Sequence, residues 1–381
     1  MIELETEQST LGATIKVVGV GGAGGNTINS MIDAGYEGIE FIVANTDAQA
    51  LRTSKAASKI QLGVKSTKGL GSGANPELGR RAAEEDLDKV LETVGEADIV
   101  FLSGGMGGGT GSGALPVIAR ALKNNGILTV AIVTKPFTFE GKRRARIAEA
   151  AIDSLRKDVD TLIVIPNQKL LEVVDQEVSM IDAFARINEV LNQAVKGISD
   201  IITKPGHINV DFADMREIMH GMGMAVLGTG RSTGPDRARV AAQQAISSPL
   251  LENMSIAGAK GVLLNISGGT SLGLHELSEA SSIIYELVDN EANIIIGSVI
   301  DAAMGEEVSV TVIATGFNRP TTHVDETKQL KAALVDACLP SEMATSHAPI
   351  ITHEEIPTVS NLDMNNLDVP TYLRKQMKQA E

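Results

Sequence analysis

Several residue types are scarce in this chain of 381 residues, and each scarcity excludes a class of protein. The single cysteine, Cys338, allows no disulfide within the chain, which fits a reducing cytosol. There is no tryptophan, and the 3 tyrosines and 7 phenylalanines leave the cores to aliphatic residues. No apolar run approaches the ~20 residues that span a bilayer. Residues 1–12 are polar and acidic, which predicts a flexible tail and no signal peptide.

The charge balance excludes another class. The formal net charge of −15 repels a phosphate backbone, so general nucleic-acid binding is not expected, although one nucleotide can still bind at a local site. Glycine, by contrast, is abundant. The 38 glycines fall in clusters, which indicates that they serve particular loops.

Short apolar segments separated by helical segments run through residues 13–179. The expected strands are Ile15–Gly19, Ile39–Asn45, Ile99–Ser103, Leu128–Thr134 and Thr161–Pro166. Almost wholly apolar strands of this kind are typical of a parallel sheet that is covered on both faces. We therefore predict an α/β, doubly wound, mostly parallel domain.

A long helix and a second domain follow. Apolar residues at helical spacing predict one helix over Met180–Thr203, stopped by Lys204-Pro205-Gly206, so that 180–204 forms a central helix between two domains. Residues 205–320 are expected to form a smaller, mixed α/β domain. Its expected strands are Ala225–Gly228, Gly261–Ile266, Asn293–Ile300 and Val308–Ala314, and its expected helices are Asp214–Met222, Asp236–Ile246 and Leu274–Val288.

The pattern changes after residue 320. Residues 321–369 hold eight acids against two lysines and no sustained apolar period, which predicts a disordered acidic linker over 321–366. Residues 367–381 mix apolar and basic side chains. Composition alone leaves two interpretations open for this end, a docking peptide or an inert tail.

Three glycine clusters point to a nucleotide. Gly19–Gly24 reads GxGxxG between a strand and a helix, and Asp47 lies about 20 residues further on, as in NAD(P)-dependent oxidoreductases. A second cluster, Gly104–Gly113, also follows a strand and precedes a helix, and a third spans Gly69–Asn75. Several such loops indicate a nucleotide with several phosphates. No segment reads GxxxxGK[ST], so backbone N–H groups and helix dipoles are expected to hold the phosphates in place of a P-loop lysine.

Two acids, Asp211 and Asp214, begin a predicted helix. Two interpretations remain open from the residues alone. Asp211 is well placed as an N-cap with Asp214 in the first turn, which stabilises a helix, and both are also candidates for chemistry on a phosphate.

The motifs together resemble the tubulin and FtsZ family. Gly107–Gly113, which reads GGGTGSG, looks like the tubulin signature motif, with Met106 before it. Asn45–Leu51 and Gly69–Pro76 look like nucleotide loops of the same family. The resemblance covers about residues 13–318 and the C-terminal tip, and Ser112 stands where many members have threonine.

This resemblance implies a tubulin-like fold and a set of residues for GTP or GDP. Gly107–Gly111, Gly21, Gly22, Gly25 and Asn26 would hold phosphates, and Glu140 and Arg144 would reach the ribose and phosphate edge. Asn167 and Asn188 would contact ribose or guanine, and Phe184 would pack against the base. The full implied set is Gly21, Gly22, Ala23, Gly24, Gly25, Asn26, Asn45, Gly73, Gly107, Gly108, Gly109, Thr110, Gly111, Thr134, Glu140, Arg144, Asn167, Phe184 and Asn188.

For several of these residues the sequence by itself favours plainer interpretations. Phe184 lies on the apolar stripe of its helix, which indicates core packing. Asn188 fits an ordinary polar helix residue, and Glu140 with Arg144 fits an exposed i,i+4 ion pair.

The resemblance also implies a mechanism. Asn209, Asp211 and Asp214 look like the family's synergy loop, which acts on the nucleotide of the next subunit and orients the attacking water, with Mg²⁺ on the phosphates. Such a protein would polymerise head-to-tail with itself and act in the cytoplasm at the mid-cell division ring of bacteria. Residues 367–381 would bind division regulators and membrane-tethering proteins, so any membrane contact would be indirect.

Two competing hypotheses are weighed against this one. An NAD(P)-dependent oxidoreductase explains the first glycine loop and Asp47, but leaves the other two glycine loops without a role. A nucleotide-binding scaffold that polymerises without turnover has less need of both Asp211 and Asp214.

Overall fold

The structure is a computed structural model that describes residues 13–171, 179–204, 208, 210–248, 250–251 and 256–317. The predicted tail (1–12), linker (321–366) and docking peptide (367–381), and also Asn209, lie outside the described residues.

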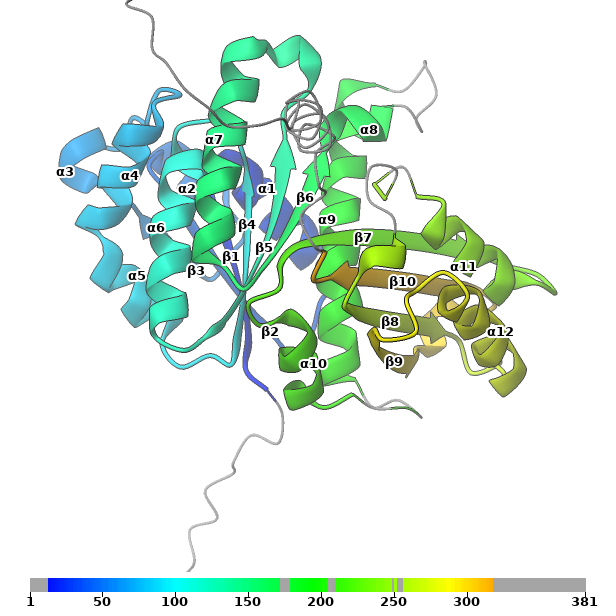
Figure 1. Ribbon diagram of the computed structural model, residues 1–381. Coiled ribbons are helices and arrows are strands. Elements are labelled where there is room, and N and C mark those ends of the chain that lie inside the picture. The colour runs from blue at the N-terminus through cyan, green and yellow to red at the C-terminus, as the bar shows by residue number, and fades with distance from the viewer. Residues whose placement is uncertain are drawn as a thin grey trace, which may run out of the picture. The chain divides into compact units, whose positions relative to one another are not determined.

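A ten-stranded sheet forms the centre of the described chain, in the order β3-β2-β1-β4-β5-β6-β7-β10-β8-β9 (Figure 1). Neighbouring strands are parallel from β3 to β7, antiparallel where β10 meets β7 and β8, and parallel between β8 and β9. The strands are β1 (Ile15–Val20), β2 (Ile39–Asn45), β3 (Ser58–Gln61), β4 (Ile99–Gly105), β5 (Leu128–Lys135), β6 (Thr161–Pro166), β7 (Gly223–Ser232), β8 (Gly261–Gly268), β9 (Asn293–Ile300) and β10 (Val308–Thr315). The predicted mostly parallel α/β fold is confirmed.

Helices cover the sheet and occupy most of the connections between strands. The α-helices are α1 (Gly21–Asp33), α2 (Ala48–Thr53), α3 (Val64–Thr67), α4 (Pro76–Glu85), α5 (Leu87–Val94), α6 (Thr110–Asn124), α7 (Lys142–Asp158), α8 (Asn167–Leu171), α9 (Met180–Thr203), α10 (Phe212–Met219), α11 (Arg237–Ile246) and α12 (Leu274–Tyr285). Three short 3₁₀ turns are η1 (Thr138–Glu140), η2 (Ile256–Gly258) and η3 (Ala302–Met304).

Strands β1, β4 and β5 are buried on both faces, which explains their continuous apolar sequence. In β1, Ile15 and Val17 enter the core beneath α1 and α9, while Val18 and Val20 enter the core beneath α4 to α7. Alternate residues of a strand point to opposite faces, so a strand between two helical layers needs apolar residues at every position.

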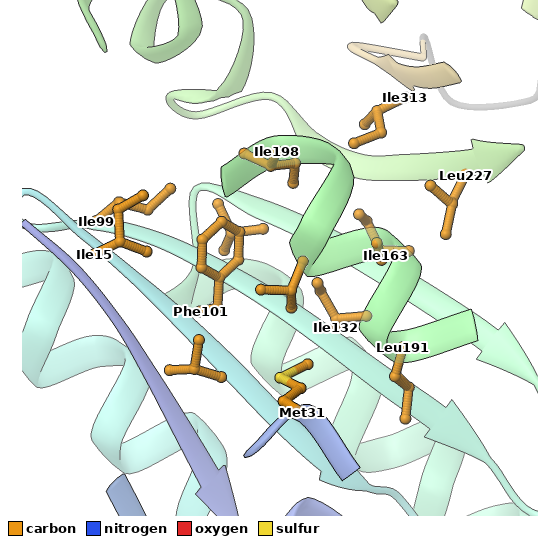
Figure 2. Packing of buried hydrophobic residues seen from close by; sticks show 14 of the residues in the cluster. Ile15, Met31, Ile99, Phe101, Ile132, Ile163, Leu191, Ile198, Leu227 and Ile313 are labelled. Carbon is orange, nitrogen blue, oxygen red and sulfur yellow. The ribbon is translucent and has the colours of Figure 1, made fainter. Parts of the chain in front are cut away.

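The long helix α9 begins and ends where the sequence predicts it. Ser179 caps it by accepting a hydrogen bond from the backbone N–H of Asp182. Ile198 of this helix lies in a core that also contains Ile163 of β6 and Ile313 of β10 (Figure 2). One helix therefore packs against the strands on both sides of the short β6–β7 pairing, which joins Thr161–Ile163 to Gly223–Ala225.

Three expected boundaries are wrong, and two of them involve glycine. The helix expected over Leu274–Val288 ends at Tyr285. The strand expected over Ala225–Gly228 extends over all of β7, because its glycines lie under α11: a Cβ on Gly230 would lie 2.1 Å from the carbonyl oxygen of Ala241. The helix expected to reach Met222 ends at Met219, because Gly221 and Gly223 adopt positive φ.

Candidate functional site

A cleft of about 490 Å³ opens at the carboxyl ends of the parallel strands β1, β4, β5 and β6. Ligands of open α/β sheets bind at this edge, beyond the carboxyl ends of the strands. Its walls come from the starts of α1 and α6, from the loop that follows α3, and from α9. The glycine loops that the sequence singles out therefore meet around one cavity.

The starts of α1 and α6 are built to receive an anion. Neither helix has a side-chain N-cap hydrogen bond, and neither has an acid in its first turn. Other helices, α3, α5, α7 and α11, also lack a side-chain cap, so what sets α1 and α6 apart is that both starts line one cleft. Two helix N-termini at one cleft thus keep backbone N–H groups for a ligand, and their dipoles favour negative charge.

The backbone of the two loops comes close enough to require glycine. Gly21 has φ +75°, and a Cβ there would lie 3.2 Å from the backbone nitrogen of Gly111. A Cβ on Gly111 would lie 2.4 Å from the carbonyl oxygen of Gly105. Gly22 lines the cleft and has no atom within 4 Å of its would-be Cβ, so the space beside it belongs to the cavity.

The far end of the cleft has aromatic and amide groups. Phe184 of α9 is 43% exposed, and its ring packs edge-on against the buried Phe137 at 5.6 Å between centroids. The interpretation of Phe184 as a core residue is therefore wrong: the apolar stripe of α9 leaves the core at this end of the helix and enters the cleft. Asn188 also lines the cleft, and its Oδ1 lies 3.4 Å from Thr27 Oγ1.

Asn167 has an unmet hydrogen-bonding capacity. It is 6% exposed, lines the cleft, and its Oδ1 has no hydrogen-bond partner among the described residues. The Oδ1 atom is closed to solvent, so a ligand donor reaches it only when the Asn167 side chain turns toward the cleft. A buried acceptor left unpaired costs free energy, which favours such a turn.

The rim carries one ion pair. Glu140 accepts a hydrogen bond from Arg144, four residues further along, as the i,i+4 interpretation predicts. Glu140 also accepts from the backbone N–H of Phe137 at 2.9 Å, which fixes the turn η1 beside the cleft. The same two residues line the cleft, so the ion pair and a contact with a ligand are compatible.

The structure brings most of the predicted residues together. The predicted residues that line the cleft are Gly21, Gly22, Ala23, Asn26, Gly108, Gly109, Thr110, Gly111, Thr134, Glu140, Arg144, Asn167, Phe184 and Asn188. Those outside its lining are Gly24, Gly25, Asn45, Gly73 and Gly107.

Some residues outside the lining have clear local roles. A Cβ on Gly24 would lie 2.5 Å from the carbonyl oxygen of Ser103, so Gly24 lets α1 pack closely on β4. The side chain of Asn45 accepts from the backbone N–H of Asp47 and shapes the loop after β2.

Eight lining residues were not among the predicted site residues. They are Val20, Ser72, Ala74, Gly105, Met106, Pro136, Ile187 and Leu191. Ser72 and Ala74 belong to the third glycine loop, which the sequence does single out. Ile187 and Leu191 lie on the apolar stripe of α9, and the stripe alone does not reveal which of its residues face a cavity.

The acids of the predicted synergy loop lie away from this cleft. Asp211 is the N-cap of α10, and its carboxylate accepts from the backbone N–H of Asp214 at 2.7 Å, as the capping interpretation predicts. Further along α10, Arg216 donates to the carbonyl oxygen of Gly126, just before β5, and Met219 accepts from the Thr161 hydroxyl at the start of β6. The helix therefore lies at the amino ends of the strands whose carboxyl ends form the cleft (Figure 1).

Within the described part of the chain, no three His, Cys, Asp or Glu side chains are grouped so that they could hold a metal ion. No helix among those residues has the length and apolar character needed to cross a bilayer.

Comparison with protein families gives two matches. The family model described as "Tubulin/FtsZ family, GTPase domain" matches residues 14–175, and "FtsZ family, C-terminal domain" matches residues 223–318. The chain is 48% identical to the cell division protein FtsZ of Pseudomonas aeruginosa, over 96% of this chain and 97% of that protein. It is 46% identical to the protein of the same name from Pseudomonas putida, over 95% of this chain and 96% of that one.

Solved structures agree with the sequence matches. An empty FtsZ dimer from M. jannaschii superposes with a TM-score of 0.77 at 44% identity, covering 80% of this chain and 88% of that chain. CetZ2 of Haloferax volcanii, solved as a protofilament with bound GTPγS, has a TM-score of 0.67 at 19% identity over 85% of this chain and 99% of that chain, which shows a shared fold. From its two matching domains and its near full-length relatives, the chain belongs to the tubulin/FtsZ family of GTPases.

Proposed function

We propose that the protein binds GTP in the cleft, polymerises head-to-tail, and hydrolyses GTP when α10 of the next subunit closes that cleft. In this role it builds the division ring of a bacterial cell. Residues 13–179 hold the nucleotide, 180–204 form the connecting helix, and 205–320 supply the acids. Family membership and the dimeric and filamentous relatives support nucleotide binding and self-association.

One observation carries the proposal: the cleft and the two acids lie at opposite ends of the same strands. The eight residues of β5 span roughly 25 Å at about 3.3 Å per residue. Asp211 and Asp214 therefore act on the cleft of another copy. A contact between different surfaces of identical subunits leaves a free surface at each end, so it generates a filament wherever the rotation between subunits does not close a ring.

The chemistry of the cleft walls supports one orientation of the nucleotide. The uncapped starts of α1 and α6 suit the phosphates. Glu140 and Arg144 suit the ribose edge, and Phe184 suits the face of the base. The orphaned Asn167 Oδ1 suits a base or ribose donor. This orientation puts the phosphates toward β4, β1 and β2.

Mg²⁺ is proposed to bind with the nucleotide. Glu140 is the only carboxylate among the described residues that line the cleft, and it already pairs with Arg144. Mg²⁺ accepts such a site, because it commonly keeps several waters and takes phosphate oxygens as ligands. When bound, it would neutralise phosphate charge.

In the chemical step, groups of the protein position the phosphates and orient the attacking water. The N–H groups of α1 and α6 hold the phosphates in place. Asp211 and Asp214 of the neighbouring copy accept hydrogen bonds from the attacking water and fix its direction, and capping keeps α10 in place. Little covalent chemistry is asked of the protein, as is usual for phosphoryl transfer.

Residues 367–381 are proposed to dock onto division regulators and membrane-tethering proteins. The support is the sequence alone, which combines apolar Leu367, Val369 and Leu373 with basic residues beyond a long acidic segment.

The test is GTP hydrolysis per subunit as a function of protein concentration. We expect a threshold followed by a cooperative rise. Asp214→Asn should lower the rate at least about 100-fold, the scale for removing a group that acts in the transition state, while monomers still bind GTP. Glu217→Gln, one turn along the same helix, is the matched control. A rate per subunit that does not change with concentration would refute the proposal.

A mixing experiment sharpens the test. Asp214→Asn keeps an intact cleft, and Gly111→Val, with its Cβ against the Gly105 carbonyl, keeps an intact α10. Each variant alone should be inactive, but a mixture should recover part of the activity, because the second variant donates its α10 to the cleft of the first. No recovery, although the two variants co-assemble, would show that each subunit uses its own acids.

A further inference from the structure

Three hydroxyl groups from three different loops meet behind the cleft. Thr46 Oγ1 lies 2.7 Å from Thr110 Oγ1, and Ser72 Oγ lies 2.9 Å from the same atom. Thr46 follows β2, Ser72 lies in the loop between α3 and α4, and Thr110 is the first residue of α6. Thr46, Ser72 and Thr110 thus form a hydroxyl cluster.

The direction of one hydrogen bond in the cluster follows from burial. Thr46 is fully buried, and within the described chain its hydroxyl has Thr110 Oγ1 as its only hydrogen-bond partner. A buried O–H that donates to nothing is costly, so Thr46 donates its proton to Thr110.

The other two hydroxyls then present one proton to the cleft. Ser72 and Thr110 both line the cleft, whereas Thr46 does not. If Ser72 donates to Thr110, the Thr110 proton points into the cleft, and if Thr110 donates to Ser72, the Ser72 proton does. In either arrangement one hydroxyl group of the cluster is free to donate a hydrogen bond to a ligand oxygen. The hydrogen bonds among the three hydroxyl groups strengthen that donor cooperatively.

The strand order indicates which part of a nucleotide this proton meets. Asn167 follows β6 and Arg144 follows β5, and both mark the base and ribose end of the proposed orientation. Starting at β6, the strand order is β6, β5, β4, β1, β2 and β3. The residues of the hydroxyl cluster lie in segments that follow β2, β3 and β4, so the cluster lies on the far side of β5 from Asn167. The third phosphate is the part of GTP that lies farthest from the base. In this orientation it is therefore the group that reaches the hydroxyl cluster.

The loop that carries Ser72 needs support from outside itself. Lys68 and Ala74, at its two ends, have φ values of 53° and 57°, which are unfavourable for residues other than glycine. Such backbone persists where surrounding contacts hold it. The Ser72–Thr110 bond and the bond from Gly71 N–H to the Thr46 carbonyl at 3.2 Å both join this loop to the other two.

We infer that Ser72 and Thr46 are positioning residues that aim one hydroxyl proton at the third phosphate and so favour GTP over GDP. The inference rests on the proposed function, since it assigns a selectivity to the proposed GTP cleft. Thr46 does not line the cleft and orients the hydroxyl of Thr110 through its hydrogen bond. Ser72 lines the cleft and forms its hydrogen bond to Thr110 from the loop between α3 and α4.

The experiment measures GTP and GDP affinities for the full chain, kept below its assembly concentration. Ser72→Ala should weaken GTP about threefold, which is less than the loss of a whole hydrogen bond because Thr110 keeps its hydroxyl, and should change GDP less than twofold. Ser72→Thr keeps a hydroxyl and should restore the GTP:GDP ratio. Ser66→Ala is the matched control, because the Ser66 hydroxyl reaches the Gly63 carbonyl and lies outside the cluster.

A double-mutant cycle separates this role from a structural one. Thr46→Val keeps the shape of the side chain and removes its hydroxyl. If both residues act through Thr110, the effects of Thr46→Val and Ser72→Ala on the GTP:GDP ratio will be non-additive, whereas independent structural effects would add. Thermal unfolding without nucleotide checks that each variant is folded.

Either of two results would overturn the inference: an unchanged GTP:GDP ratio in Ser72→Ala, or the same change in Ser66→Ala. Failure of the proposed function looks different, because the unaltered protein itself would then not bind GTP.

Discussion

The region of β1 to β6 (residues 13–171) and the region of β7 to β10 (residues 223–317) both depend on glycine, but for different purposes. In the first region Gly21 and Gly22 open backbone N–H groups to a cleft. In the second, Gly228 and Gly230 lie beneath α11, where a Cβ would come within about 2.2 Å of a carbonyl oxygen. Glycine makes room for helix packing in both regions, as Gly24 shows in the first, but only in the first does it also make room for a ligand.

The two regions also differ in how their polar groups are satisfied. In the first, the buried Ser103 Oγ and Asn167 Oδ1 have no partner within the described chain. In the second, none of the described side chains has such an orphaned atom. Arg237 shows the contrast: it is 5% exposed, makes two hydrogen bonds to Glu276, and also donates to the carbonyl oxygens of Ser271 and Glu306. Of these orphaned atoms, only Asn167 Oδ1 belongs to a residue that lines the cleft, so it alone connects an unmet hydrogen bond with the candidate site.

The largest expected effect tests the closed network of the second region. Arg237→Met should lower the free energy of unfolding by about 3–5 kcal/mol, because it leaves Glu276 and two carbonyls without their donor. Nucleotide affinity of the folded protein should stay within twofold. Arg239→Met on the same helix is the control, since its ion pairs are exposed and should matter by less than about 1 kcal/mol. Denaturant unfolding measures both, and equal effects would contradict the comparison.

A pair of matched glycine changes separates stability from binding. Gly230→Ala should destabilise the fold by about 1–3 kcal/mol through overpacking against α11, with binding intact. Gly22→Ala meets no protein atom, so the Tm should hardly change, but its methyl group enters the cleft and should weaken GTP strongly. Calorimetric unfolding and nucleotide titration distinguish the two. Loss of stability in Gly22→Ala would show that the glycine has a structural role.

Asn167→Leu should move stability and binding in opposite directions. It removes an orphaned buried acceptor, so the empty protein should be as stable or slightly more stable. GTP affinity should fall about tenfold, the scale of one lost hydrogen bond of about 1.4 kcal/mol. Asn192→Leu is an informative partner, because Asn192 also has an orphaned Oδ1 but donates to Ser30 and does not line the cleft. If Asn192→Leu lowered GTP affinity as much as Asn167→Leu, the assignment of Asn167 as a ligand-binding residue would be wrong.

The smallest effect concerns acid stability. Hydrogen bonding to Arg237 lowers the pKa of Glu276. A carboxyl group whose folded pKa is depressed contributes stability above its unfolded value, and that stability is lost as the pH falls through the folded pKa. Glu276→Gln should therefore flatten part of the decline in stability below about pH 4.3, the ordinary glutamate value, and leave neutral GTP binding unchanged. An identical acid profile in both proteins would contradict this.

Much of the fold could be read from the sequence where the signal is local. The strands Ile39–Asn45 and Asn293–Ile300 and the helix Met180–Thr203 have the predicted bounds. The spacing of their apolar residues and the residues that flank them are sufficient to predict where these elements begin and end. The edge strand β3 escaped prediction because its four residues, Ser58–Gln61, are polar at three positions and lack an apolar run.

The candidate site divides in the same way. Gly21, Gly22 and Gly108–Gly111 could be predicted, since a glycine loop between a strand and a helix has a recognisable pattern. Phe184 could not be assigned from its helix, because the same apolar stripe serves the core at one end and the cleft at the other. Ser72 offered only a loop of glycines as a signal, since its partner Thr110 lies 38 residues away.

The sequence by itself determined the loops, the helices and the family, because glycine clusters, capping residues and apolar periods act within a few neighbouring residues. Tertiary structure decided what these pieces do together. It put the acids of α10 at the opposite end of the strands from the cleft, and it joined Thr46, Ser72 and Thr110 into one cluster. Such arrangements depend on contacts between residues far apart in the chain, and these are fixed only when the sheet assembles and its two helical layers pack.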